Sequence, residues 1–180
     1  MTMRRAGLIV AAALFGALAS GCSNDTGAPA SDVSADDLQR LQALEVREAI
    51  RQLLIDYGRT IDSRDFGGFA DLFTADADYG GGGPGGMSHG PEAIRAGLEK
   101  NFQQNPSGVS GPNFHVFYNE SIQVDGDTAT AVSKGAFVIQ AEGNRPEMLI
   151  LATYHDSLVR DGGRWKFKRR ELQPDIPAPR

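Results

Sequence analysis

The spacing of apolar residues changes once along the chain, and this change limits the folds that the chain can adopt. Between residues 38 and 61 apolar side chains recur every three or four positions, which is the spacing of one buried helix face. Ser34 and Asp37 stand at the start of this stretch in the arrangement of a helix capping box. After residue 112 the chain instead predicts three or four long strands. Helices followed by strands indicate an α+β domain.

Turn signals indicate how the predicted strands pair. Asp125-Gly126-Asp127 and Asp161-Gly162-Gly163 favour tight hairpins, so neighbouring strands are expected to be antiparallel. A short helix is expected after Asp65, and a third helix is expected to open at Gly90-Pro91. Helices on one face of a curved antiparallel sheet would leave a cavity between the two layers. The expected strands cover residues 77–79, 113–124, 128–141, 148–160 and 164–173.

The N-terminus has the pattern of a secretion signal. Arg4 and Arg5 precede an apolar run over residues 6–19, which is too short to cross a bilayer comfortably and fits a signal-peptide core. Leu18-Ala19-Ser20-Gly21-Cys22 resembles the lipobox of bacterial lipoproteins, in which the Cys is acylated and becomes the mature N-terminus. The usual Leu three places before the Cys is Ala19 here, so an ordinary secretory signal with a free Cys22 is the alternative.

These features predict the domain organisation and the location of the protein. We expect a signal peptide over residues 1–21, a lipidated Cys22 with a flexible linker over residues 22–35, one globular domain over residues 36–173 and a C-terminal tail over residues 174–180. A lipid on Cys22 would hold the domain at a membrane of the bacterial cell envelope, on its periplasmic or extracytoplasmic side.

Charge and composition exclude several classes of partner. Acidic residues outnumber basic ones by 23 to 18, and the Lys and Arg residues form no long block, so a nucleic-acid partner is not expected. One Cys cannot close an intrachain disulfide, and the three His residues have no zinc-binding spacing. We therefore expect no metal site.

Three segments carry a family resemblance. Residues 50–79, with the run Ile61-Asp62-Ser63-Arg64-Asp65-Phe66, resemble the opening of SnoaL-like domains in the nuclear transport factor 2-like superfamily. Gly90-Pro91-Glu92 is similar to the start of that group's third helix, and residues 154–170 are similar to its last hairpin. The resemblance spans residues 38–172 and implies a cone: a curved antiparallel sheet wrapped around a long N-terminal helix and two shorter helices. This fold serves lyases, isomerases, binding modules and docking domains, so it specifies activity poorly.

Asp62 and His115 are the candidate catalytic pair. A carboxylate beside an imidazole fixes the tautomer of the ring, so the His can remove a proton from carbon near neutral pH. The pair resembles the Asp/His dyad of scytalone dehydratase, bile-acid 7α-dehydratase and hexachlorocyclohexane dehydrochlorinase, whose chemistry is cofactor-free elimination. The residues alone favour another interpretation, in which Asp62 caps or ends a helix and His115 is a hydrogen-bonded core histidine.

The resemblance also implies ligand-binding residues. Tyr57 matches a Tyr of the bile-acid dehydratase pattern, Tyr79 matches a phenol of the scytalone enzyme, and Tyr154 falls where that enzyme has a pocket amide. Arg170 stands five residues after Trp165, as an Arg does in the final strand of the dehydrochlorinase, where it could stabilise a leaving anion. Without the resemblance, the more frequent situation for each Tyr is that of an amphipathic core residue with one satisfied hydroxyl.

Strand alternation offers a second interpretation of Arg170. It places Lys166, Lys168 and Arg170 on one face of the last strand, and Trp165, Phe167 and Arg169 on the other. If the Trp165 face lines the cavity, Arg170 belongs to an exposed basic edge.

Two functions therefore remain open from sequence. The first is a cofactor-independent lyase or isomerase that acts on a hydrophobic cyclic small molecule such as a polyketide, steroid or terpene-like compound. The second is a non-catalytic lipoprotein that binds a small apolar ligand or docks a partner. The resemblance also implies a homodimer through the outer sheet face, for which Tyr118, Ile122, Ile150 and Leu158 would supply the apolar contact.

Overall fold

The computed structural model describes residues 33–81, 86–104 and 112–176. The predicted signal peptide, Cys22 and nearly all of the predicted linker lie outside these described residues. No helix within them is long and apolar enough to cross a membrane. The helices precede the long strands along the chain, as the apolar spacing predicts.

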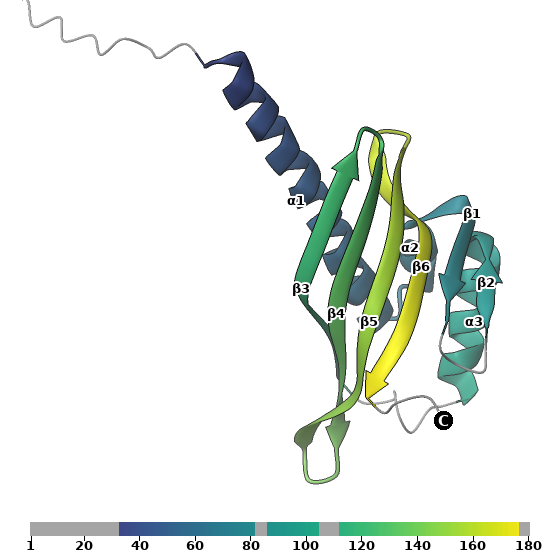
Figure 1. Ribbon diagram of the computed structural model, residues 1–180. Helices are drawn as coiled ribbons and strands as arrows, with labels where there is room; N and C mark the ends of the chain where they lie inside the picture. The colour runs from purple at the N-terminus through teal and green to yellow at the C-terminus, as the bar shows by residue number, and fades with distance from the viewer. Residues whose placement is uncertain (1–32, 82–85, 105–111, 177–180) are drawn as a thin grey trace, which may run out of the picture. The chain divides into compact units, whose positions relative to one another are not determined.

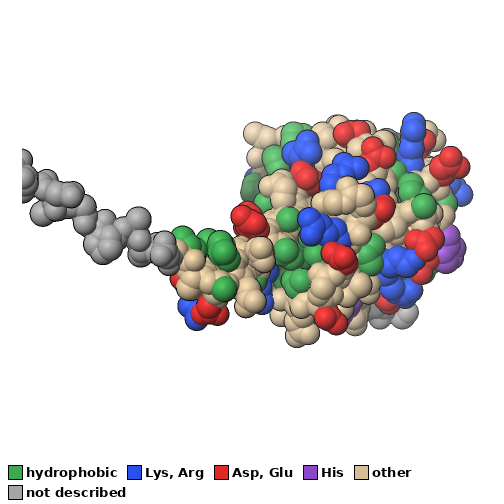
Figure 2. Space-filling view, turned by 90° about the horizontal axis from the view of Figure 1, so that it is seen from above, with side chains coloured by type: hydrophobic (Ala, Val, Ile, Leu, Met, Phe, Trp, Pro, Cys, Tyr) green, Lys and Arg blue, Asp and Glu red, His purple; other side chains and the backbone are tan. Residues whose placement is uncertain are grey.

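Helix α1 (Ala35–Asp62) begins at the predicted capping box. The Ser34 hydroxyl accepts a hydrogen bond from the backbone N–H of Asp37 at 3.1 Å, and the Asp37 carboxylate accepts one from the backbone N–H of Ser34 at 3.3 Å. The C-terminal half of α1 packs against the sheet, whereas its first turns extend past the sheet (Figure 1) and leave apolar side chains exposed on the surface (Figure 2). These exposed side chains are Leu38, Leu41 and Leu44.

Two short helices complete the helical part. Helix α2 (Phe66–Ala70) is capped by Asp65, whose carboxylate accepts from the backbone N–H of Gly68 at 2.8 Å. Helix α3 (Gly90–Gln104) starts at the predicted Gly90 and buries Ile94 and Leu98 on its inner side.

The long strands form a meander whose hairpins are antiparallel, as predicted from the two turns. The sheet has the order β2-β1-β6-β5-β4-β3 and curves over α1, with α3 beside β1 and β2 (Figure 1). The predicted α+β class is confirmed. The four strands of the meander are β3 (Asn113–Asp125), β4 (Thr128–Ala141), β5 (Arg145–Asp161) and β6 (Arg164–Ile176).

The sheet differs from the prediction at several strands, and β5 begins three residues earlier than expected, at Arg145. Strand β1 (Phe73–Gly80) is longer than expected and lies parallel to β6, so the sheet is not wholly antiparallel. Strand β2 (Met87–His89) was not predicted; it pairs antiparallel with β1. Strand β6 continues to Ile176, three residues into the predicted tail, because its end pairs with β5 and Asp175 accepts hydrogen bonds from Lys134 and Thr153.

The core lies between the inner face of the sheet and the helices. Each fully buried large apolar side chain contributes about 1.5–3 kcal/mol relative to leaving it in water. Aromatic rings from four elements dominate this core and pack in tilted or edge-on pairs. The most deeply buried of these rings belong to Tyr57, Phe69, Phe73 and Phe167.

The residues predicted for a dimer contact do not lie together on the outer face. Ile122 and Leu158 are buried in the core, Ile150 lines an internal cavity, and Tyr118 is exposed. Asn119 has a positive φ of 54°, and the β3–β4 register shifts between Tyr118 and Ser121. This irregularity turns Ile122 to the face opposite Tyr118, which simple alternation could not anticipate.

Candidate active site

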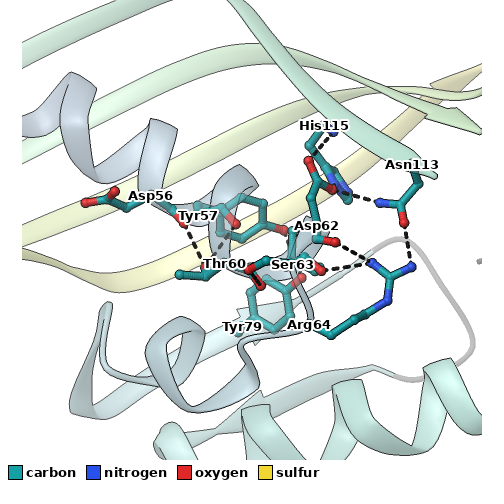
Figure 3. A network of polar contacts seen from close by, with 10 residues as sticks. Asp56, Tyr57, Thr60, Asp62, Ser63, Arg64, Tyr79, Asn113 and His115 are labelled. Atoms are coloured by element: carbon teal, nitrogen blue, oxygen red, sulfur yellow. Dashed lines mark hydrogen bonds and ion pairs between the residues drawn. The ribbon is translucent and has the colours of Figure 1, made fainter.

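Asp62 and His115 lie in contact, although 53 positions separate them. Asp62 is the last residue of α1, and His115 stands near the start of β3, which packs along that helix. The Asp62 Oδ1 atom lies 2.6 Å from Nδ1 of His115, and Oδ2 accepts the backbone N–H of His115 at 2.8 Å (Figure 3). Both side chains are mostly buried, with 11% of His115 and 19% of Asp62 exposed.

This contact determines which imidazole nitrogen is available as a base. An ionised carboxylate only accepts hydrogen bonds, so the proton of a neutral His115 ring belongs on Nδ1. The lone pair then lies on Nε2, on the side of the ring away from Asp62. His115 lines the internal cavity, and its ring also packs on Phe137 with centroids 4.7 Å apart.

The cavity next to His115 has a volume of about 180 Å³. Residues of helices α1 and α3 and of strands β1, β3, β4, β5 and β6 line it. Gly135 on β4 leaves room for the rings at its floor, because a Cβ there would come within 2.6 Å of the Tyr154 ring. The lining residues are Tyr57, Ile61, Tyr79, Leu98, Asn101, Phe102, His115, Gly135, Phe137, Ile150, Tyr154 and Leu172.

The three predicted tyrosines all line this cavity. The hydroxyls of Tyr57 and Tyr79 are 2.9 Å apart, and either can donate to the other. Burial raises the pKa of Tyr57 well above its ordinary value of 10.0, raises the pKa of Tyr79 to about 12, and raises the pKa of Tyr154 as well. The phenols therefore keep their protons near neutral pH and can donate hydrogen bonds to a ligand oxygen.

Arg170 does not reach the cavity. Its side chain has no exposed surface; Nη1 donates to Oδ2 of Asp156 at 3.0 Å, and the guanidinium lies over the rings of Tyr57 and Tyr154, 4.0 and 4.4 Å from their centroids. The predicted contact with a leaving anion is thus not available to it here. Arg170 instead supports two of the cavity tyrosines from behind.

A β-bulge explains why the predicted faces of β6 are wrong beyond Lys168. Leu158 of β5 pairs with Phe167, but the preceding residue, Ser157, pairs with Arg169. Lys168 is therefore an extra residue, and alternation restarts one position later. As a result Arg170 faces inward like Phe167, whereas Arg169 is exposed.

Two further residues of the site were not predicted. Asn113 donates from Nδ2 to Oδ1 of Asp62 at 2.8 Å, and Arg64 donates from Nη2 to Oδ1 of Asn113 at 2.5 Å (Figure 3). Asn113 stands two positions before His115 on β3, so shared strand parity could have pointed to it. Arg64 has a positive φ of 63°, which no local signal indicated.

The arrangement suits proton transfer inside the cavity. It offers one basic nitrogen from His115 and hydroxyl donors from the tyrosines, while the remaining walls are mostly apolar. Such a site can take a proton from a carbon acid and hydrogen-bond the oxygen on which negative charge develops.

Comparison with known proteins agrees with this fold. The sequence profile of the SnoaL-like domain matches residues 42–171. The chain is 31% identical over 137 residues to the uncharacterized protein Rv2910c of Mycobacterium tuberculosis, which covers 74% of this chain and 90% of that protein. A solved NTF2-like protein with a cystatin-like fold from Novosphingobium aromaticivorans superposes with a TM-score of 0.71 at 25% identity, over 81% of this chain and 92% of the other.

A second solved structure from Novosphingobium aromaticivorans, a candidate scytalone dehydratase, superposes with a TM-score of 0.62 at 25% identity, over 77% of this chain and 89% of that one. Fold and site together define an α+β cone with a polar pair at its inner wall. The chain belongs to the SnoaL-like domain family, within the nuclear transport factor 2-like proteins.

Proposed function

We propose that this protein is a cofactor-independent lyase or isomerase that acts on a hydrophobic cyclic small molecule. The observation that carries the proposal is the 2.6 Å contact between Asp62 and Nδ1 of His115 at the wall of the aromatic cavity. The contact leaves Nε2 as the acceptor for a substrate proton, and the imidazole suits proton transfer near neutral pH.

The size and lining of the cavity suggest the reacting part of the substrate. A cavity of about 150 Å³ lined by apolar side chains can hold a benzene ring. The volume of about 180 Å³ beside His115 therefore suits one six-membered ring at the site of reaction. Tyr57 and Tyr79 suit a ring that carries a carbonyl or hydroxyl oxygen, because their hydroxyls lie in the same wall.

The proposed elimination runs through an enolate. Nε2 of His115 takes the proton from the carbon next to the carbonyl, and the electrons of that C–H bond form a carbon–carbon double bond while charge moves to the carbonyl oxygen. Tyrosine hydroxyls hydrogen-bond that oxygen. The enolate then expels the hydroxyl group from the β-carbon, which is next to the carbon that lost its proton. The imidazolium gives its proton to the departing hydroxyl group, so water leaves. Return of the proton to another carbon instead gives an isomerase.

Solvent-deuterium exchange tests the proposal before the natural substrate is known. The purified chain is incubated in D₂O with cyclic ketones that do or do not carry a hydroxyl on the carbon β to the carbonyl. We expect deuterium to enter next to the carbonyl, and the hydroxylated compounds to lose water, both followed by NMR and mass spectrometry. Compounds that bind in the cavity but react no faster than in buffer would replace this proposal with the non-catalytic binding function.

We further propose that the domain is carried on a lipoprotein of the bacterial cell envelope. The support is the sequence alone: Arg4 and Arg5, the apolar run over residues 6–19 and the lipobox-like residues before Cys22. In bacteria that make the full chain, labelled palmitate is expected to enter the protein, and Cys22→Ala is expected to abolish the label. An unlabelled wild-type chain would favour the ordinary secretory signal.

A further inference from the structure

Asp62 is held by more than its contact with His115. Its Oδ1 atom receives two donors, Nδ1 of His115 at 2.6 Å and Nδ2 of Asn113 at 2.8 Å, and its Oδ2 atom receives the backbone N–H of His115. All three donors come from the start of β3. The carboxylate plane is therefore fixed by one short segment of strand, on which the side chains of residues 113 and 115 share a face.

Arg64 determines which way the Asn113 amide points. A guanidinium has only donors, so the Asn113 atom that faces Arg64 at 2.5 Å must be the carbonyl Oδ1. The NH₂ group of Asn113 then faces Asp62, as a carboxylate requires. With the amide reversed, an oxygen would face the carboxylate and an NH₂ would face the guanidinium. The amide orientation thus follows from the charges at its two ends.

Arg64 is itself held in place by the end of α1. Its Nη1 atom donates to the carbonyl oxygens of Ile61 and Asp62 at 3.1 and 3.0 Å, which belong to the last turn, where carbonyls lack partners within the helix. Its guanidinium lies 4.3 Å from the ring centroid of Phe102, a cavity residue on α3. The left-handed backbone at Arg64 turns the chain immediately after the helix.

We propose that Arg64 and Asn113 form a positioning relay that holds the Asp62 carboxylate in the orientation that keeps the proton of His115 on Nδ1. Neither residue lines the cavity, so neither is a catalytic residue. The relay extends the Asp–His pair to four side chains from α1, the turn after it and β3 (Figure 3). The relay rests on the proposed function only because that function uses Nε2 as the base. The orientation of the Asp62 carboxylate is itself a property of the free protein.

Nitrogen NMR of the labelled His115 ring tests the relay without a substrate, because the two neutral tautomers have different ¹⁵N shifts. The wild type is expected to show the Nδ1–H form alone. Asn113→Leu, which keeps the shape but loses both polar atoms, is expected to show a mixture of tautomers. Arg64→Asn is expected to do the same, and Asn tolerates the left-handed backbone at this position.

Arg95→Asn is the matched control, because Arg95 lies on α3 and pairs with Glu99, away from Asp62 and Asn113. It should leave the Nδ1–H form unchanged. On any compound that the wild type turns over, the relay variants are expected to lose about tenfold in kcat with KM nearly constant. Relay variants that keep a pure Nδ1–H tautomer would overturn the relay. Absence of turnover in the wild type would instead count against the proposed function and leave the tautomer result standing.

Discussion

Replacing His115 with Asn is expected to remove turnover while the folding transition stays almost unchanged. The Asn amide places an N–H near the position of Nδ1, so Asp62 keeps a donor, but no basic nitrogen reaches the cavity. General-base catalysis typically contributes about 10²–10⁴-fold, and we expect a loss of that size in kcat. The rate is measured by deuterium exchange, and folding by urea denaturation.

The variant Asp62→Asn, which changes the partner of His115, is expected to lower kcat by a similar factor for a different reason. An amide can donate to Nδ1 of His115, which moves the ring proton to Nε2 and removes the base from the cavity. His155→Asn is the matched control, because His155 is an exposed histidine on β5 outside the cavity. Turnover that survives His115→Asn, or fold and activity lost together, would contradict the assigned role.

The features predicted correctly from sequence are those determined by local physics. The capping box at Ser34, the apolar stripe of α1 and the two glycine turns each act within a few residues, so they appear in the structure where the sequence places them. The pairing of Asp62 with His115 is not local. It was predicted through the family resemblance, and the two side chains do lie together.

The features missed depend on irregularities in strand pairing. A bulge at Lys168 brings Arg170 to the inner face, and another near Asn119 turns Ile122 inward. A bulge is determined by both strands of a pair, so alternation within one strand cannot reveal it. The relay has the same property, since Arg64 reaches Asn113 only through a left-handed turn that follows α1.

Replacing Arg170 with Met is expected to be the most destabilising single change considered. Arg170 and Asp156 both have fully buried side chains and meet at 3.0 Å. Loss of one partner leaves the other charge buried and unpaired, which typically costs about 3–5 kcal/mol in the free energy of unfolding. Even in the intact pair, three buried atoms have no hydrogen-bond partner among the described residues: Oδ1 of Asp156 and Nε and Nη2 of Arg170.

The double variant Arg170→Met with Asp156→Leu separates loss of the charge pair from loss of packing. Replacing a buried ion pair with apolar residues of similar volume is often neutral or stabilising. We therefore expect the double variant to recover most of the stability lost in Arg170→Met, as measured by urea denaturation at pH 7. Arg169→Met, which changes an exposed neighbour on β6, is the matched control and should have little effect.

The loss in Arg170→Met should also depend on pH in a definite direction. Burial raises the pKa of Asp156 to about 6 from 3.8, an effect that the Arg170 charge opposes. Between about pH 4 and pH 6 the native protein therefore holds a proton that the unfolded chain has released. The contribution of Asp156 to stability is present below about pH 4 and is lost as the pH rises through about 6. Without Arg170 the pKa of Asp156 rises further, so the carboxyl stays neutral at pH 5. The loss of unfolding free energy in Arg170→Met should thus be smaller at pH 5 than at pH 7. A loss that is independent of pH, or that persists in the double variant, would show that lost packing rather than the unpaired carboxylate is responsible.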